Sequence, residues 1–211
     1  KHIPKAVVLT LALLFCTACG STRQAECVDV LSNTENSRYS FELKYEDEKE
    51  LIAVTDKSSG ESFIIPEETF VDESYSIMSI YPTENYLYYM KGRNSGVSIY
   101  RIKLSDMTRE EIIKSSDTAD KSILGLTFSW SDTENRFSAV RLFTDEKNIY
   151  LIDKNGMVSV LNPFAEKITD CTCIIEESVL GGCIFDGKAI YYIDEDGVQK
   201  MYNVVNKTFR I

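Results

Sequence analysis

The sequence predicts an all-β protein built from repeated antiparallel hairpins, and three observations predict this fold class. Tyrosine, isoleucine and valine gather in short runs bounded by turn residues, a composition that favours strands. Apolar and polar residues alternate within several of these runs, as in a strand that has two different faces. One unit recurs four times along the 211 residues, and such internal repetition is typical of modular folds.

The recurring unit is a strand-like run, a turn that contains glycine, and a second alternating run. Its four copies cover Leu51–Glu68, Leu87–Leu104, Ile149–Phe164 and Ile190–Val205. A glycine accepts the positive φ of a tight turn, and the turn glycines are Gly60, Gly96, Gly156 and Gly197. They are 36, 60 and 41 residues apart. Two of these spacings lie near the roughly 40–50 residues of a propeller blade. The longest interval holds an insertion around Leu126–Phe137, which contains Trp130.

Further strands are expected on both sides of each hairpin. The runs that precede the hairpins are Tyr39–Tyr45, Tyr75–Tyr81, Phe137–Phe143 and Val179–Phe185. Outer strands are expected at Cys171–Ile175 and Lys207–Ile211, whereas Glu110–Lys114 could form a helical turn instead. Four-stranded antiparallel sheets repeated in line build a β-propeller. Each sheet has two apolar faces, which neighbouring sheets must cover.

Residues 38–211 accommodate about four such sheets. Three architectures are compatible with this number: part of a larger propeller, a closed four-bladed propeller, or another antiparallel meander such as a sandwich. Propellers of five to eight blades are commoner than four-bladed ones, which favours the partial propeller.

The first residues have the composition of an export signal. A basic head of Lys1, His2 and Lys5 is followed by an uncharged apolar run from Ala6 to Ala18. This run is shorter than the roughly 20 residues of a membrane-spanning helix. We therefore expect a signal peptide over residues 1–18 and a polar tether over residues 19–37.

The end of the signal, Cys16-Thr17-Ala18-Cys19, resembles the lipobox of bacterial lipoproteins. The resemblance implies that Cys19 is diacylated and becomes the mature N-terminus, which would anchor the protein on the extracytoplasmic side of the bacterial cell envelope. Cys16 departs from the family pattern, which usually has leucine at this position. The alternative is an ordinary cleaved signal followed by an unrelated cysteine.

Two of the repeats resemble a known kind of blade. The run Tyr86–Met90 followed by Ile99–Ile102, and the run Ile190–Asp194 before Gly197, are similar to blades of bacterial lipoprotein β-propellers of unknown function. Those blades in turn resemble the YWTD propeller of low-density-lipoprotein receptors. The resemblance implies a binding or scaffold module outside the cytoplasm.

Composition excludes several functional classes. The net charge of −10 disfavours nucleic acid as a partner. The only histidine is His2, so a chain cleaved before Cys19 has no imidazole for catalysis or metal binding. The sequence also has no nucleotide-binding loop, nucleophile elbow or zinc-protease motif. We therefore expect no catalytic residue, cofactor or metal, and a ligand that is a protein or a glycan.

Two alternative functions remain compatible with the sequence. The first is a carbohydrate-active propeller enzyme that works without histidine, through carboxylates or tyrosines. It predicts acidic residues from several blades at one end of the axis, above an aromatic floor. The second is an envelope-assembly protein that binds its partner along an exposed strand edge.

Acidic and aromatic pairs each have a structural interpretation. Asp153–Gly156 and Asp194–Gly197 look like half of a calcium loop, but the twelfth position counted from Asp194 is Val205, so both are expected to be hairpin turns. Adjacent carboxylates on a strand point to opposite faces, so they are expected to be solvated. They are Glu67-Glu68, Glu110-Glu111, Asp145-Glu146 and Glu176-Glu177. For the same reason, we expect at most one tyrosine of each adjacent pair to face the core. These pairs are Tyr88-Tyr89 and Tyr191-Tyr192.

Four cysteines remain besides those of the signal and the lipidation site, namely Cys27, Cys171, Cys173 and Cys183. Export permits disulfides, and a bond from Cys183 to Cys171 or Cys173 is the local possibility. In a propeller, these cysteines would belong to the outermost strand of one blade and the innermost strand of the next. The alternative is that they are small buried residues with free thiols.

Overall fold

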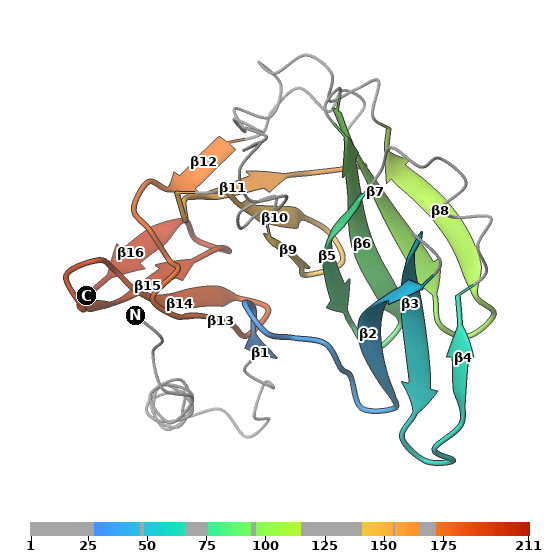
Figure 1. Cartoon of the computed structure of the whole chain (residues 1–211). Helices are drawn as coiled ribbons and strands as arrows, with labels where there is room; N and C mark the ends of the chain where they lie inside the picture. Colours follow the sequence, from blue (N-terminus) through green and yellow to red (C-terminus); the bar gives the residue numbers. More distant parts are fainter. Residues whose placement is uncertain are drawn as a thin grey trace.

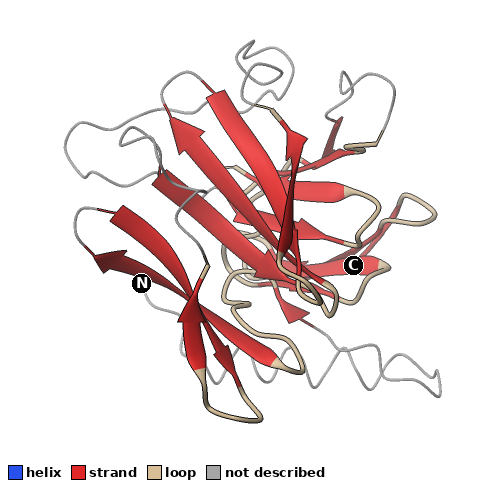
Figure 2. Cartoon of the chain, turned by 90° about the vertical axis from the view of Figure 1, so that its right-hand side faces the viewer, coloured by secondary structure: helices blue, strands red, loops and turns tan. Residues whose placement is uncertain are grey.

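The computed structural model describes residues 28–46, 49–65, 76–93, 96–114, 141–153, 155–164 and 172–211. Its strands form antiparallel sheets that follow one another in chain order around a common centre (Figure 1). Figure 2 shows strands and loops in the described part of the chain. No helix in these ranges has the length and apolar character needed to cross a membrane.

Each sheet corresponds to one predicted repeat, and we number them blades 1 to 4. Blade 1 contains β2 (Tyr39–Glu46), β3 (Lys49–Asp56) and β4 (Ser62–Ile64). Blade 2 contains β5 (Ser76–Pro82), β6 (Tyr86–Arg93), β7 (Gly96–Lys103) and β8 (Thr108–Ile113). Blade 3 contains β9 (Arg141–Thr144), β10 (Ile149–Ile152), β11 (Val158–Leu161) and β12 (Thr172–Ile175). Blade 4 contains β13 (Cys183–Phe185), β14 (Ala189–Ile193), β15 (Gln199–Asn203) and β16 (Thr208–Arg210).

The predicted hairpins and the all-β, bladed fold are confirmed. The hairpins are β3–β4, β6–β7, β10–β11 and β14–β15, each paired antiparallel. Gly60, Gly156 and Gly197 have φ values of 74°, 84° and 79°, as their tight turns require. The insertion around Trp130 lies outside the described residues.

The possible helical turn at Glu110–Lys114 is wrong, because most of this segment belongs to strand β8. Strand β8 pairs with β7, and Arg101 lies opposite Glu110 in the register. Their side chains form an ion pair at 2.7 Å between Arg101 Nη2 and Glu110 Oε2. Cross-strand pairing therefore outweighs the local helical preference of two glutamates.

Both faces of the inner strands are buried, which corrects the expectation for adjacent tyrosines. Tyr88 and Tyr89 are 1% and 0% exposed, and Tyr191 and Tyr192 are 6% and 0% exposed. Tyr88 packs in a core shared by blades 2, 3 and 4, whereas Tyr89 packs in a second core between blades 1 and 2. Because neighbouring sheets cover a blade on both sides, two adjacent side chains that point in opposite directions can both be buried.

Aromatic rings join the blades near the centre. Phe143 of β9 stacks on Tyr150 within blade 3, with ring centroids 4.9 Å apart. The same ring packs edge-on against Phe185 of blade 4 at 5.2 Å and lies 6.4 Å from Tyr81 of blade 2. Phe143 therefore contacts three blades, and such aromatic pairs contribute beyond the area they bury.

The N-terminal part of the described chain is packed into the fold. Strand β1 (Val28–Asp29) pairs antiparallel with β13, so blade 4 gains a fifth strand (Figure 1). Val30 is 3% exposed and donates its backbone N–H to the Cys183 carbonyl at 2.9 Å. We call residues 28–37 the axial strap. Residues 28–37 of the segment predicted to be a polar tether therefore pack against the blades, and residues 19–27 lie outside the described ranges.

Candidate functional site

The axial strap links three blades through side-chain hydrogen bonds. After pairing with blade 4, it reaches the turn between β5 and β6, where Asn33 Nδ2 donates to the Pro82 carbonyl at 3.2 Å. Asn36 Nδ2 then donates to the Thr83 carbonyl at 2.7 Å, directly before the chain enters blade 1. The strap therefore holds blade 4, blade 2 and the start of blade 1 together, and cavities lie on two sides of it.

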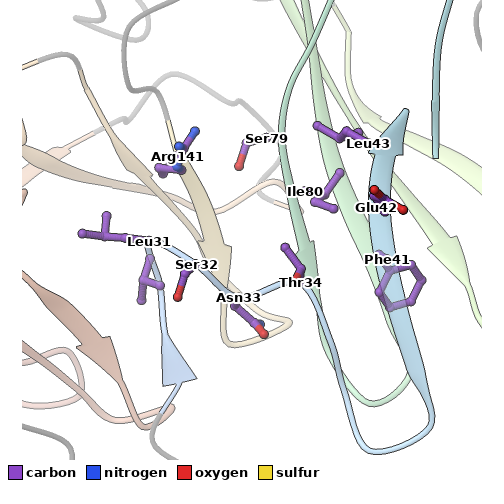
Figure 3. A pocket seen from close by; sticks show the side chains of 11 residues that line it. Leu31, Ser32, Asn33, Thr34, Phe41, Glu42, Leu43, Ser79, Ile80 and Arg141 are labelled. Atoms are coloured by element: carbon purple, nitrogen blue, oxygen red, sulfur yellow. The ribbon is translucent and has the colours of Figure 1, made fainter. Parts of the chain in front are cut away.

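The first cavity has a volume of about 360 Å³, and we call it the Arg141 cavity. Its walls come from the strap and from blades 1, 2 and 3 (Figure 3). The lining residues are Val30, Leu31, Ser32, Asn33, Thr34, Phe41, Glu42, Leu43, Ser79, Ile80 and Arg141. Five of these residues are apolar and six are polar or charged, so the cavity offers both apolar surface and hydrogen-bonding groups to a ligand.

The second cavity, of about 250 Å³, lies on the side of the turns that join the first two strands of each blade. Glu35, Glu84 and Asp186 line it, together with Tyr81 and Phe185, and we call it the acidic cavity. Acidic residues from the strap and from two blades therefore meet beside aromatic rings. This is the convergence that the enzyme alternative predicts.

The carboxylates of the acidic cavity are engaged in hydrogen bonds and ion pairs that hold the fold. Both Glu84 oxygens accept from Ser37, one from its backbone N–H at 3.1 Å and the other from its hydroxyl. Glu35 pairs with Lys57 Nζ at 3.4 Å. Asp186 caps the turn of blade 4. Their contacts therefore favour a structural role over general acid or base catalysis.

The cap at Asp186 has a counterpart with the same hydrogen bonds in blade 3. Its Oδ1 accepts the backbone N–H groups of Lys188 and Ala189 at 2.8 and 2.6 Å, and its Oδ2 accepts the Tyr191 hydroxyl at 3.1 Å. In blade 3, Asp145 Oδ1 likewise accepts the backbone N–H groups of residues 147 and 148 at 3.0 and 2.6 Å.

The hydroxyl of Tyr150 completes this counterpart, donating to Asp145 Oδ2 at 3.1 Å. Sequence reasoning missed this pair of caps, although the pattern Asp-x-Lys-x-Ile-Tyr occurs at 145–150 and again at 186–191. This repeated pattern could have predicted the two caps from the sequence.

Blade 2 departs from this arrangement. Thr83 stands where blades 3 and 4 have aspartate, and its hydroxyl donates to Glu146 Oε1 of blade 3 at 2.6 Å. The buried Tyr88 hydroxyl, which corresponds to those of Tyr150 and Tyr191, has no hydrogen-bond partner within the described ranges. Burial raises the pKa of Tyr88, and the nearby Arg101 opposes the shift without forming a well-aligned hydrogen bond to the hydroxyl.

A second polar cluster joins the segment after β12 to blade 4. Lys200 Nζ pairs with Asp194 Oδ2 at 2.9 Å and with Glu177, which also accepts the Tyr192 hydroxyl. The hydrogen bond to Glu177 is the main cause of the raised pKa of Lys200, and the bond from Lys200 lowers the pKa of Glu177. A lysine held in its charged form is a poor nucleophile, so this cluster stabilises the fold.

The two half-calcium patterns are hairpin turns. Asp153 Oδ1 accepts the backbone N–H groups of Asn155 and Met157, and Asp194 Oδ1 accepts those of Asp196 and Val198. Within the described ranges, no cluster of acidic, cysteine or histidine side chains could hold a metal ion.

The cysteine expectations are partly resolved. Cys173 and Cys183 are both free, so the disulfide between them is not formed. Cys173 lies in β12, the outer strand of blade 3, and Cys183 lies in β13, between β1 and β14 in blade 4. The propeller order therefore separates them. Cys19, Cys27 and Cys171 lie outside the described residues.

Comparison with known proteins gives similarities to solved structures. No family model matches the sequence, and no curated protein matches it. Among solved structures, the chain is similar to a chain in "Crystal structure of Nidogen/Laminin Complex", at 12% sequence identity and a TM-score of 0.44. The match covers 82% of this chain and 58% of the other, so this chain spans less than two thirds of that protein chain.

Proposed function

We propose that this protein is a non-catalytic binding module that a lipid on Cys19 anchors to the outer face of a bacterial membrane. The observation that carries the binding role is the Arg141 cavity, to which the strap and three blades contribute. Binding groups that come from several packed sheets are held in fixed positions, which lowers the entropy cost of binding. The partner is a protein whose contact surface enters this cavity.

The sequence and the position of the strap both support the lipid anchor. The lipobox resemblance ends at Cys19, and the strap begins at residue 28 beside the inner strand of blade 4. The short segment of residues 20–27 would therefore connect the lipid to the centre of the fold. Two acyl chains give stable attachment, whereas one chain alone holds weakly.

Replacing the lipidated residue tests the anchor. The variant Cys19→Ala is expected to leave the membrane fraction and appear in the soluble extracytoplasmic fraction, as measured by fractionation and immunoblotting. Cys27→Ala is the matched control, and it should remain with the membrane. Retention of Cys19→Ala in washed membranes would contradict the proposal.

Site-specific photocrosslinking tests the binding role. A photoreactive residue at Leu43, which lies at the Arg141 cavity and is 42% exposed, is expected to form a discrete adduct with one protein on intact cells. The control position is Val205, which is 72% exposed and does not line the cavity. Equal adducts from both positions, or none from Leu43, would count against a partner at this cavity.

A His-independent carbohydrate-active enzyme is the second candidate, because the acidic cavity places carboxylates beside Tyr81 and Phe185. This candidate requires the purified chain to hydrolyse a glycan, and Glu35→Gln to reduce the rate. Glu61→Gln, in the turn before β4 and outside the acidic cavity, serves as the control. We expect no hydrolysis by the wild-type chain across a panel of polysaccharides.

A further inference from the structure

The Arg141 cavity contains a guanidinium that the described fold does not use. Arg141 is the first residue of β9 and is half-buried, and its side chain has no ion pair or hydrogen bond among the described residues. Two other arginines do have carboxylate partners. Arg101 pairs with Glu110 at 2.7 Å, and Arg38 pairs with Asp56 at 3.1 Å. A partly desolvated cation without a counterion favours binding of an anion.

A second hydrogen-bond donor lies beside Arg141. Ser79 is 5% exposed, and its Oγ accepts the backbone N–H of Leu142, the next residue after Arg141, at 3.1 Å. Because the oxygen serves as the acceptor, the hydroxyl proton remains available, and it has no acceptor in the described ranges. Figure 3 shows Ser79 and Arg141 on facing strands at the same level of the gap.

The position of Ser79 depends on an irregularity in the sheet. The register of β5 with β6 shifts between Ile77 and Ser79, which marks a β-bulge. A bulge re-aims the side chains that follow it, and bulges are common next to functional sites. Here the bulge is followed by Ser79, which points to β9, and by Ile80, which also lines the cavity.

The remaining walls favour a particular kind of anion. Leu31, Phe41, Leu43 and Ile80 supply apolar surface, and the volume of about 360 Å³ fits more than an isolated inorganic ion. Glu42 is the acidic residue of the lining, and its Oε2 forms an ion pair with Lys44 Nζ at 3.9 Å. The planar guanidinium binds a carboxylate through two parallel hydrogen bonds, and the hydroxyl supplies a third donor.

We propose that the Arg141 cavity binds a peptide carboxylate that is flanked by an apolar side chain. Arg141 holds the carboxylate, Ser79 donates to one of its oxygens, and the apolar walls cover the neighbouring side chain. This inference rests on the proposed binding function and names the chemical class that the cavity recognises in the protein partner. The carboxylate comes either from a chain terminus or from an acidic side chain.

Small peptides test the inference on the full chain. The probes are N-acetyl-Phe-Leu with a free terminal carboxylate, N-acetyl-Phe-Leu-amide, and N-acetyl-Leu-Asp-amide, which has only a side-chain carboxylate. Binding is measured by calorimetry and by the NMR resonance of the Arg141 Nε–H group. We expect the free acid or the aspartyl peptide to bind, and the better of the two identifies the source of the carboxylate. The amide without a carboxylate should bind weaker by about tenfold or more.

Matched variants assign the effect to the cavity. Arg141→Gln should weaken binding of the carboxylate probe by about tenfold or more, because a charged hydrogen-bond pair is lost. Arg141→Lys keeps the charge but loses the planar guanidinium, so its affinity for the probe should lie between those of the wild type and Arg141→Gln. Arg210→Gln makes the same charge change on the exposed strand β16 and should leave binding unchanged. Equal unfolding temperatures for the variants exclude a loss of fold.

Three results overturn the inference: equal affinity for the acid and its amide, unchanged affinity in Arg141→Gln, or no shift of the Arg141 resonance with any probe. Failure of this inference differs from failure of the proposed function. If the Leu43 crosslink to a partner persists while carboxylate probes do not bind, only the carboxylate specificity is wrong. If the crosslink is absent as well, the binding function itself fails.

Discussion

Blade 2 and blade 3 solve the same local problem in different ways. Each begins its second strand after a short turn and buries a tyrosine five residues beyond the first turn position. In blade 3, Asp145 caps the turn and accepts the Tyr150 hydroxyl at 3.1 Å. In blade 2, Thr83 Oγ1 accepts the backbone N–H of Tyr86 at 3.1 Å, and its hydroxyl donates to Glu146 of blade 3 at 2.6 Å. The Tyr88 hydroxyl has no hydrogen-bond partner among the described residues.

The difference shows that a turn side chain can bond to a neighbouring blade while it still caps its own turn. The Thr83 carbonyl also accepts Asn36 Nδ2 of the strap, so this turn is the place where the strap, blade 2 and blade 3 meet. A short hydroxyl suits that junction, because it reaches Glu146 without adding a second negative charge beside it. The cost is a buried Tyr88 hydroxyl that has no hydrogen bond in the described part of the chain.

The largest expected effect is a loss of stability at alkaline pH. Burial raises the pKa of Tyr150, with nearby Asp145 adding to the shift, and burial likewise raises the pKa of Tyr81, Tyr89 and Tyr192. In the unfolded chain these tyrosines titrate near pH 10, whereas in the folded chain they stay protonated to higher pH. Their contribution to the free energy of unfolding is therefore complete below about pH 10 and is lost as the pH rises further. Denaturant unfolding at several pH values measures this, and a flat profile to pH 11 would contradict it.

The next largest expected effect is a difference in stability between variants of the blade 3 turn and the blade 2 turn. Asp145→Ala removes two backbone hydrogen bonds and leaves the Tyr150 hydroxyl unpaired, and we expect a loss of about 2–4 kcal/mol in the free energy of unfolding. Thr83→Ala, its counterpart in blade 2, should cost only about 1 kcal/mol. Urea denaturation measures both variants. Equal losses would show that the aspartate cap has no special role.

The smallest effect concerns the tyrosine hydroxyls themselves. Tyr150→Phe should reduce the free energy of unfolding by about 1 kcal/mol, because its hydrogen bond to Asp145 is lost. Tyr88→Phe removes a buried hydroxyl that makes no hydrogen bond to any described residue, so it should be neutral or raise stability by up to about 1 kcal/mol. The two variants are compared by thermal and urea unfolding. A loss in Tyr88→Phe as large as in Tyr150→Phe would reveal a partner for the Tyr88 hydroxyl.

Periodicity and composition allowed much of the fold to be predicted. Alternating runs and turn glycines located the four hairpins, because strand pairing within a hairpin depends on nearby residues. Aspartates at 153 and 194 were correctly interpreted as turn residues, since their caps involve only the next four positions. Local hydrogen bonding is encoded in short segments, and so it can be inferred from them.

The candidate site could not be predicted from the sequence to the same extent. Arg141 begins an ordinary strand, Ser79 follows a bulge, and neither residue belongs to a recognisable motif. They meet because blades 2 and 3 pack together, so their proximity depends on contacts between residues 63 positions apart. The strap escaped prediction for the same reason, since its polar composition gives no sign that β1 pairs with β13 far along the chain.

The sequence by itself determined the strands, the tight turns and the repeated sheet, because each of these depends on residue preferences and on hydrogen bonds between near neighbours. Only the tertiary structure decided which side chains face one another at the centre. It placed both tyrosines of a pair in separate cores and bonded the polar strap to blades 2 and 4. It also left Arg141 without a partner among the described residues of its cavity. Those outcomes follow from how whole sheets pack, and packing depends on residues that are distant in the chain.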